Sequence, residues 1–353
     1  MPWNLVLVQL GPSKPRHLFA NLSHLIDLFP TVQIVVVYDD AKLQKRISRD
    51  FPQIELFKFD GSQNEGIWSQ SRLNFQFRKG FWRYSTERLL ALEQVHELRP
   101  GHGLLHIESD MLLFPNFPFE SVTSGNTLAW QTVSESHDVA AVMFSPSLAH
   151  TEVFSNKIRE KLADNPYLND MTLLSQIRIE NPSLLTTLPS WNSDWGMPIA
   201  ASARDYALIT DEYSAYEGIF DGSTIGVWLT GQDRRNNGGR LVLHSDFPGS
   251  LTDTSLLSFR IDSNGNLWAK AQGMESPIFC LHVHSKNIKL FRDGYRKELG
   301  AFCELSSTKD RIALGFSPSA FWQWLKPILP AFLHLSNYVR FGKRIFNQQR
   351  GRI

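Results

Sequence analysis

The segment TVQIVVVYDD at residues 31–40 places the strongest constraint on the fold of this chain. Its β-branched run does not alternate with polar residues, which predicts a strand covered on both faces, as in a parallel sheet. Strand-like and helix-like segments alternate around it, and this order predicts a Rossmann-like, nucleotide-binding α/β half over residues 1–110. We expect strands at 4–10, 53–59 and 103–107, and helices at 16–29, 41–50 and 81–98.

The pattern is less regular beyond residue 111. The segments 61–80 and 181–250 are rich in polar residues or in glycine, proline and tryptophan, so loops are expected there. With no internal repeat apparent, we predict one mixed α/β domain over residues 1–310, with its second half at 111–310. Its expected strands are 127–131, 139–144 and 278–284, and its expected helices are 148–163 and 169–179.

The C-terminal segment 311–353 has a composition of its own. It contains seven of the 36 basic residues, none of the 35 acidic ones, and many aromatic side chains, which predicts a basic, helical tail. Such a composition is typical of an interfacial helix, and residues 317–353 would then make a peripheral membrane contact. A C-terminal helix packed on the domain with a solvated basic end fits equally well.

Overall composition excludes several classes of protein. The net charge of +1 argues against a general nucleic-acid binder. The only cysteines, Cys280 and Cys303, exclude a disulfide framework and a CxxC zinc cluster. The first residues resemble a strand more than a signal peptide, and no apolar run reaches the roughly 18 residues of a membrane span. We therefore expect a cytoplasmic protein, with peripheral attachment to the inner face of a membrane left open.

The motif HIESD at residues 106–110 is the most specific chemical feature. Glu108 and Asp110 follow a predicted strand directly, and ligands of open α/β sheets bind beyond the carboxyl ends of strands. Hard cations such as Mg²⁺ and Mn²⁺ prefer carboxylate oxygens. Capping a helix or filling a turn is the competing interpretation of such an acidic pair.

Other side chains are candidates for the same chemistry. Arg88 falls on the apolar face of the helix at 81–98, so it needs a partner: Asp39, Asp40 or a ligand phosphate. His284 ends the strand at 278–284, on the face that also carries Cys280 and His282, and Lys286 follows it.

Two aspartates are candidates for a general base. Asp221 and Asp170 each precede a predicted helix, so each either caps that helix or faces a substrate. The sequence leaves both readings open.

Together, YDD, the inward-facing arginine, HIESD and the late LHVHSK resemble GT-A-fold glycosyltransferases, with Glu108-Ser109-Asp110 as a DxD-like motif. The resemblance implies a Mn²⁺ or Mg²⁺ ion held by Asp110 and His284. It also implies nucleotide-sugar contacts from Glu108, Arg88 and Lys286, and nucleoside contacts from the residues at the ends of the early strands, which are Gly11, Asp39 and Asp40. Asp221, then Asp170, is the expected catalytic base of an inverting reaction.

The resemblance implies transfer of a sugar from a nucleotide-diphosphate sugar to a glycan, glycolipid or polysaccharide acceptor, as in polysaccharide biosynthesis. A UDP-sugar is the favoured donor. Two alternatives are a non-catalytic sugar-nucleotide or glycan-binding protein on a degenerate transferase fold and a sugar nucleotidyltransferase. The latter usually carries a glycine-rich, basic loop after the first strand, whereas GPSKPR at residues 11–16 has a single glycine.

Overall fold

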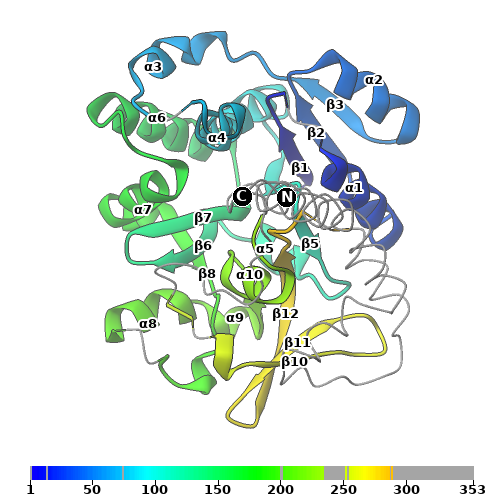
Figure 1. Ribbon diagram of the computed structural model, residues 1–353, viewed down its shortest axis with the longest axis vertical. Helices are drawn as coiled ribbons and strands as arrows, with labels where there is room; N and C mark the ends of the chain where they lie inside the picture. Colours follow the sequence, from blue (N-terminus) through cyan, green and yellow to red (C-terminus); the bar gives the residue numbers. More distant parts are fainter. Residues whose placement is uncertain are drawn as a thin grey trace, which may run out of the picture.

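A computed structural model describes residues 2–12, 15–73, 75–198, 202–233, 251–252, 254–286 and 288. The tail predicted at 311–353 lies outside these residues. The described part is a mixed α/β structure with a large central sheet and a smaller second sheet (Figure 1). None of its helices is long and apolar enough to cross a membrane.

The central sheet has seven strands in the order β3-β2-β1-β4-β7-β6-β8. The four strands from β3 to β4 are parallel, β7 is antiparallel to both its neighbours, and β8 is parallel to β6. The strands are β1 (Trp3–Gln9), β2 (Ile34–Tyr38), β3 (Glu55–Lys58), β4 (Gly103–Ile107), β6 (Leu128–Ser134), β7 (His137–Ser145) and β8 (Leu185–Leu188). This arrangement confirms the predicted Rossmann-like first half.

Both faces of the central sheet are covered, as the unbroken apolar run at β2 predicts. Alternate residues of β1 enter different cores: Leu5 and Leu7 pack with one set of helices, Val6 and Val8 with another. The first core contains α1 (Arg16–Leu28) and α2 (Ala41–Asp50). The second contains α4 (Phe81–Leu98), α6 (Leu148–Asp164) and α7 (Asp170–Glu180), on the other side of the sheet in Figure 1.

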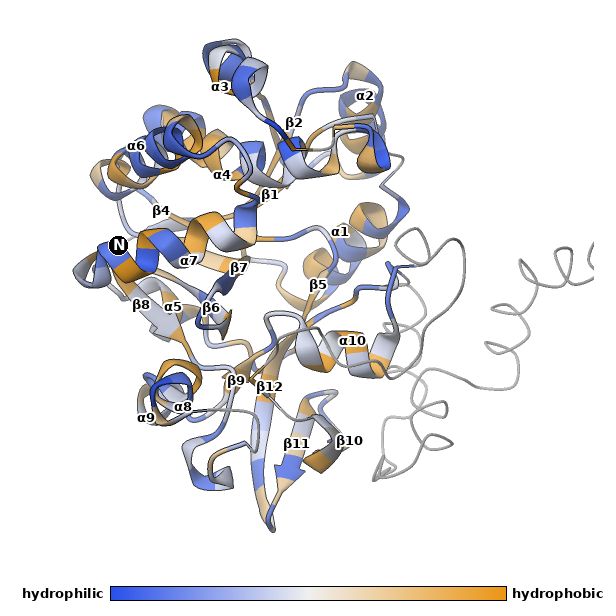
Figure 2. Cartoon of the chain, turned by 60° about the vertical axis from the view of Figure 1, so that its left-hand side comes forward, coloured by the Kyte–Doolittle hydropathy of each residue, from blue (hydrophilic) through white to orange (hydrophobic). Residues whose placement is uncertain are grey.

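The helices of the second core have mixed surfaces. Hydrophobic and hydrophilic residues follow one another along α6 and α7 in Figure 2. Phe154 and Ile158 of α6 and Leu173 of α7 are fully buried, whereas Val153 and Ile179 are exposed. The helices are therefore held by one apolar face packed on the sheet, as their periodicity predicts.

The second sheet joins distant parts of the chain. Its order is β10-β11-β12-β5, with the short β9 pairing with β12. A third core, between this sheet and the segment around α10 (Thr224–Thr230), includes Trp191, Trp195 and Leu281. The strands are β5 (Met111–Leu113), β9 (Ile219–Phe220), β10 (Ser258–Ile261), β11 (Leu267–Ala271) and β12 (Met274–His282), and the remaining helices are α3 (Glu65–Gln70), α5 (Phe119–Thr123), α8 (Ala203–Thr210) and α9 (Tyr213–Tyr216).

Two loop predictions are wrong. Residues 61–80 contain α3, and the described part of 181–250 contains β8, β9 and three helices. These elements are short, and the tertiary contacts of buried residues such as Trp68 and Trp195 stabilise them where local composition favours turns. The elements predicted at 41–50, 81–98 and 103–107 match α2, α4 and β4 residue for residue.

We expect His96 to make the stability of the central sheet depend on pH. His96 is fully buried in α4, where Nε2 donates to the His102 carbonyl (2.7 Å) and Nδ1 contacts the Thr151 hydroxyl (2.6 Å). Burial lowers the pKa of this imidazole below its ordinary 6.5. Below pH 6.5 the histidine binds a proton in the unfolded chain but stays neutral in the native protein, so the free energy of unfolding falls as the pH falls.

Urea unfolding at about pH 7.5 and about pH 5.5 measures this loss of stability. His96→Gln is expected to lose less stability between the two pH values, and an unchanged loss would contradict the assignment.

Candidate functional site

The candidate site lies where the strand order of the central sheet reverses. β1 lies between β2 and β4, and all three strands are parallel, so their carboxyl ends lie at one edge. The chain leaves β1 through α1 on one face and enters β4 from α4 on the other. Glu108 and Asp110 follow β4 directly at this switch point, which is where open α/β sheets bind their ligands.

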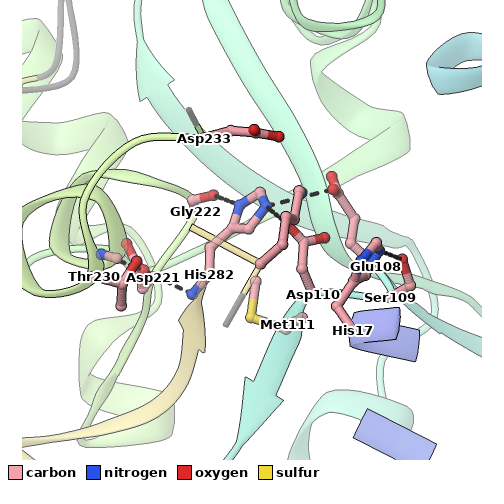
Figure 3. Close-up of polar contacts among 12 residues, drawn as sticks. His17, Glu108, Ser109, Asp110, Met111, Asp221, Gly222, Thr230, Asp233 and His282 are labelled. Atoms are coloured by element: carbon pink, nitrogen blue, oxygen red, sulfur yellow. Dashed lines mark hydrogen bonds and ion pairs between the residues drawn. The ribbon is translucent and has the colours of Figure 1, made fainter. Parts of the chain in front are cut away.

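Two carboxylates and one imidazole converge there. The Nε2 atom of His282 lies 3.1 Å from Oδ2 of Asp110 and 3.5 Å from Oε2 of Glu108. Within the described part of the chain, one ligand atom from each of the three residues lies within 4.8 Å of the other two. Figure 3 shows the His282 ring at the end of β12, directed toward both carboxylates. The arrangement offers oxygen and nitrogen ligands that suit Mn²⁺ or Mg²⁺.

The histidine in contact with the carboxylates is His282, whereas the sequence pattern favoured His284. β12 ends at His282, and its pairing of His282 with Met111 of β5 brings the ring beside Asp110. His284 lies in the following turn, with its ring stacked on that of His282 at 4.0 Å between centroids. The alternation along β12 placed both histidines on one face, but the end of the strand decided which one reaches the carboxylates.

The protonation of His282 follows from its partners. Nδ1 lies 2.7 Å from the Gly222 carbonyl, which only accepts, so Nδ1 carries a proton. Burial lowers the pKa of His282, but the carboxylates of Asp110 and Glu108 outweigh burial and raise it to about 9. The ring is therefore an imidazolium in the metal-free protein. The Gly222 contact also matches the way metal-binding histidines are oriented, with the second nitrogen donating to a carbonyl.

Arg88 anchors the other side of the cluster. Its guanidinium lies 2.7 Å from Oε1 of Glu108 and 3.3 Å from Oδ2 of Asp170. The need for a partner was predicted, but the carboxylates that pair with Arg88 belong to Glu108 and Asp170 and not to Asp39 or Asp40; contact with a ligand phosphate stays a prediction. Burial raises the pKa of Glu108, but Arg88 and His282 more than offset this and hold it below its ordinary value. Arg88 therefore fixes Glu108 as a carboxylate in one orientation.

Lys286 completes the cluster on the side of Asp110. Its ammonium contacts Oδ2 of Asp110, the oxygen that also faces His282. Burial raises the pKa of Asp110, but Lys286 and His282 outweigh it and hold that pKa well below its usual range. Acidic and basic groups thus alternate from Asp170 through Arg88, Glu108, His282 and Asp110 to Lys286.

Asp221 has a clear structural role. Its Oδ1 accepts from the backbone N–H of Ile225 (3.0 Å), and its Oδ2 accepts from the N–H groups of Gly226 (2.8 Å) and His282 (2.9 Å). It is 2% exposed, and burial raises its pKa to about 6. These bonds join the start of α10 to the end of β12, so Asp221 holds His282 in place, as the capping interpretation predicts.

The early strands bring the predicted nucleoside residues together in part. The N–H of Gly11 donates to Oδ2 of Asp39 (2.8 Å), which joins the ends of β1 and β2. Gly11 has φ +82°, and a Cβ there would lie 2.5 Å from the Tyr84 ring, so this position requires glycine. Asp40 instead caps α2 by accepting from the Lys42 N–H (2.9 Å). The ring of Tyr84, which the sequence analysis did not single out, packs beside Gly11 at the end of β1.

One face of α1 supports the HIESD segment, and the sequence analysis missed it. His17 contacts the Ser109 hydroxyl (3.0 Å), Asn21 donates to the Met111 carbonyl (2.8 Å), and His24 contacts the Leu113 carbonyl (2.8 Å). Their spacing of four and three residues puts them on one helix face. That row of polar residues at helical spacing was the available signal.

Two tryptophans of the segment 181–250 are core residues. Trp191 and Trp195 are each 1% exposed and pack edge to face. Trp195 donates to the Met274 carbonyl (2.9 Å). They stabilise the second sheet and offer no face to a ligand.

Comparison with known proteins identifies no family. No protein-family model and no curated protein sequence matches the chain. It is similar to the galactosyltransferase LgtC, solved with donor and acceptor sugar analogues, at 9% identity and a TM-score of 0.37, over 53% of this chain and 73% of LgtC. It is similar to the bifunctional glycosyltransferase WbbM at 13% identity and a TM-score of 0.35, over 53% of this chain and 39% of WbbM. It is also similar to the bifunctional IspDF of Campylobacter jejuni at 10% identity and a TM-score of 0.29, over 53% of this chain and 49% of IspDF. Similarity at this level does not establish an activity, which has to be inferred from the site itself.

Proposed function

We propose that this protein is a metal-dependent glycosyltransferase of GT-A-like fold that uses a nucleotide-diphosphate sugar, with a UDP-sugar favoured. The observation that carries the proposal is the convergence of Glu108, Asp110 and His282 at the switch point of the central sheet. Carboxylates and an imidazole in this place suit a cation bound to a diphosphate. A glycan or lipid-linked acceptor, polysaccharide biosynthesis and a peripheral place at the inner face of a membrane belong to the same proposal.

Three side chains would hold the Mn²⁺ or Mg²⁺ ion: Asp110, Glu108 and His282. Such an ion, when bound, neutralises the negative charge that develops on the departing nucleoside diphosphate. Arg88 lies between two carboxylates, so its role is to orient Glu108. His284 stacks on His282, which favours a role in orienting that ring over direct ligation.

The donor would lie along the edge formed by β1, β2 and β4. Gly11 and Asp39 would contact the nucleoside, because they are joined at the ends of β1 and β2. Lys286 lies on Asp110 with 23% of its side chain exposed, so its ammonium can approach an anionic diphosphate. Asp40 caps α2, which supports a structural role for that aspartate.

The choice of catalytic base between Asp221 and Asp170 stays a prediction. Asp221 accepts three backbone hydrogen bonds, and Asp170 lies against Arg88. Burial raises the pKa of both carboxyl groups, as a general base requires. Because both side chains already have structural partners, a sugar-nucleotide-binding protein without turnover is the second candidate function.

Thermal shift with nucleotide sugars, each with and without Mn²⁺, tests the proposal. A ligand at about 100 times its Kd stabilises a protein by about 2.7 kcal/mol, which raises the Tm by several degrees. We expect one class of nucleotide sugar to do so only with Mn²⁺, and Asp110→Asn to abolish the shift. Asp50→Asn, at the exposed end of α2, is the matched control and should retain it.

Product analysis on the same samples separates the two candidate functions. Slow release of the nucleoside diphosphate identifies a transferase, and stable binding without release identifies a binding protein. The absence of a shift with every nucleotide sugar, or an Asp110→Asn variant that behaves like the wild type, would contradict both.

A further inference from the structure

We propose that Lys286 is an exchangeable internal counter-ion, which occupies the Asp110 carboxylate until a divalent cation displaces it. The inference rests on the proposed function, because it assigns the cation to Glu108, Asp110 and His282. It adds that metal binding at this site is a competition between the cation and a side chain of the protein.

The contact between Lys286 and Asp110 is the first observation. The ammonium lies on Oδ2 of Asp110, whose side chain is 3% exposed. The same oxygen faces His282 at 3.1 Å, so a metal bound by Asp110 and His282 would have the ammonium as its immediate neighbour. His282 and Lys286 already share this oxygen, but a divalent ion bound there would replace the Nε2 proton of His282 and repel the ammonium more strongly than the singly charged ring does. Entry of the metal therefore requires Lys286 to leave.

Arg88, a further cationic side chain of the cluster, is held more firmly than Lys286. Arg88 is bound by two carboxylates, Glu108 and Asp170, and its side chain is 15% exposed. Among the residues that the structure describes, Lys286 forms an ion pair with one carboxylate, and its side chain is 23% exposed. Displacing Lys286 therefore breaks one ion pair, whereas displacing Arg88 would break two.

The backbone conformation of Lys286 is a further observation. Its N–H donates to the Val283 carbonyl (2.8 Å) in the turn after β12, and its φ is +60°. A lysine in the left-handed region costs free energy that the surrounding contacts must supply. The turn thus places the Lys286 side chain over Asp110 at a cost in backbone free energy.

Titration of the full chain with Mn²⁺ in a calorimeter, with no nucleotide present, tests the inference by measuring the affinity for the metal. We expect Lys286→Met to bind Mn²⁺ roughly tenfold or more tightly than the wild type, because a competing positive charge is removed. Lys286→Arg keeps the charge and should bind Mn²⁺ no more tightly than the wild type. Lys270→Met, on β11, is the matched control and should leave the affinity unchanged.

Thermal melting supplies a second measurement that does not depend on activity. Without metal, Lys286→Met leaves Asp110 short of one cation, so its Tm should fall below that of Lys270→Met, and Mn²⁺ should restore it by a larger shift than in the wild type. Equal or weaker Mn²⁺ binding by Lys286→Met would overturn the inference.

The outcomes separate the inference from the proposed function. Equal Mn²⁺ affinity in the wild type and in Lys286→Met, together with metal-dependent nucleotide-sugar binding by the wild type, would contradict the counter-ion role but not the proposed glycosyltransferase. Tighter Mn²⁺ binding by Lys286→Met, together with no nucleotide-sugar binding by the wild type, would support the counter-ion role and contradict the transferase.

Discussion

Gly226→Ala is expected to destabilise the protein strongly and to weaken metal binding with it. A Cβ at Gly226 would lie 1.9 Å from the His282 carbonyl oxygen and 2.7 Å from Oδ2 of Asp221, so α10 could not keep its position against β12. Overpacking of this kind costs about 1–3 kcal/mol, and a clash with backbone belongs at the upper end. Urea unfolding gives the loss of stability, and Mn²⁺ titration of the folded fraction should show weaker binding, because His282 must shift.

Gly66→Ala is the matched control for this variant. Gly66 lies in α3, and a Cβ there would meet nothing within 4 Å. Alanine in a helix is favoured over glycine by about 0.5–1 kcal/mol, so this variant should be slightly more stable. If both variants changed stability equally, close packing of α10 on β12 would not be the cause.

Arg88→Met is expected to have the other large effect. The substitution removes the shared partner of Glu108 and Asp170, which leaves Asp170 without its cation and Glu108 with His282 alone. Removing one member of a buried ionic group typically costs about 3–5 kcal/mol. The free energy of unfolding measured in urea should fall by that amount, although methionine replaces much of the buried volume.

Two comparisons isolate the electrostatic cause. Arg159→Met removes a more exposed ion pair with Glu93, for which a loss within about 1 kcal/mol is expected. Adding Glu108→Gln and Asp170→Asn to Arg88→Met removes the uncompensated charges, so much of the stability should return. A triple variant as unstable as Arg88→Met alone would show that lost packing, rather than unpaired charge, is responsible.

The residue patterns of individual segments were sufficient to predict much of the fold. The apolar run at β2 requires cover on both faces, and the helical periodicity of α4 placed Arg88 among apolar residues. The need to compensate its charge followed from those residues alone. The short elements between 181 and 233 were missed because their stability comes from tertiary packing, as the buried Trp195 shows.

The candidate site was predictable only at its centre. HIESD stands at the carboxyl end of a predicted strand, where open sheets bind ligands, and both acidic residues do lie there. The polar face of α1 that supports this segment, with His17 and Asn21, was visible as a spacing of four residues. Nothing in that spacing tells which segment the helix face contacts, so its role appears only in the folded chain.

Residue patterns alone were enough to predict the α/β half, the position of the acidic pair beyond β4 and the need to pair Arg88. Tertiary structure decided which groups meet there: Asp170 on Arg88, His282 on Asp110 and Lys286 on the same carboxylate. These contacts join residues 82, 172 and 176 positions apart. The last two depend on the antiparallel register that pairs His282 with Met111. A strand's own sequence specifies which side chains share a face, but its partner and its register are set by the packing of the whole sheet.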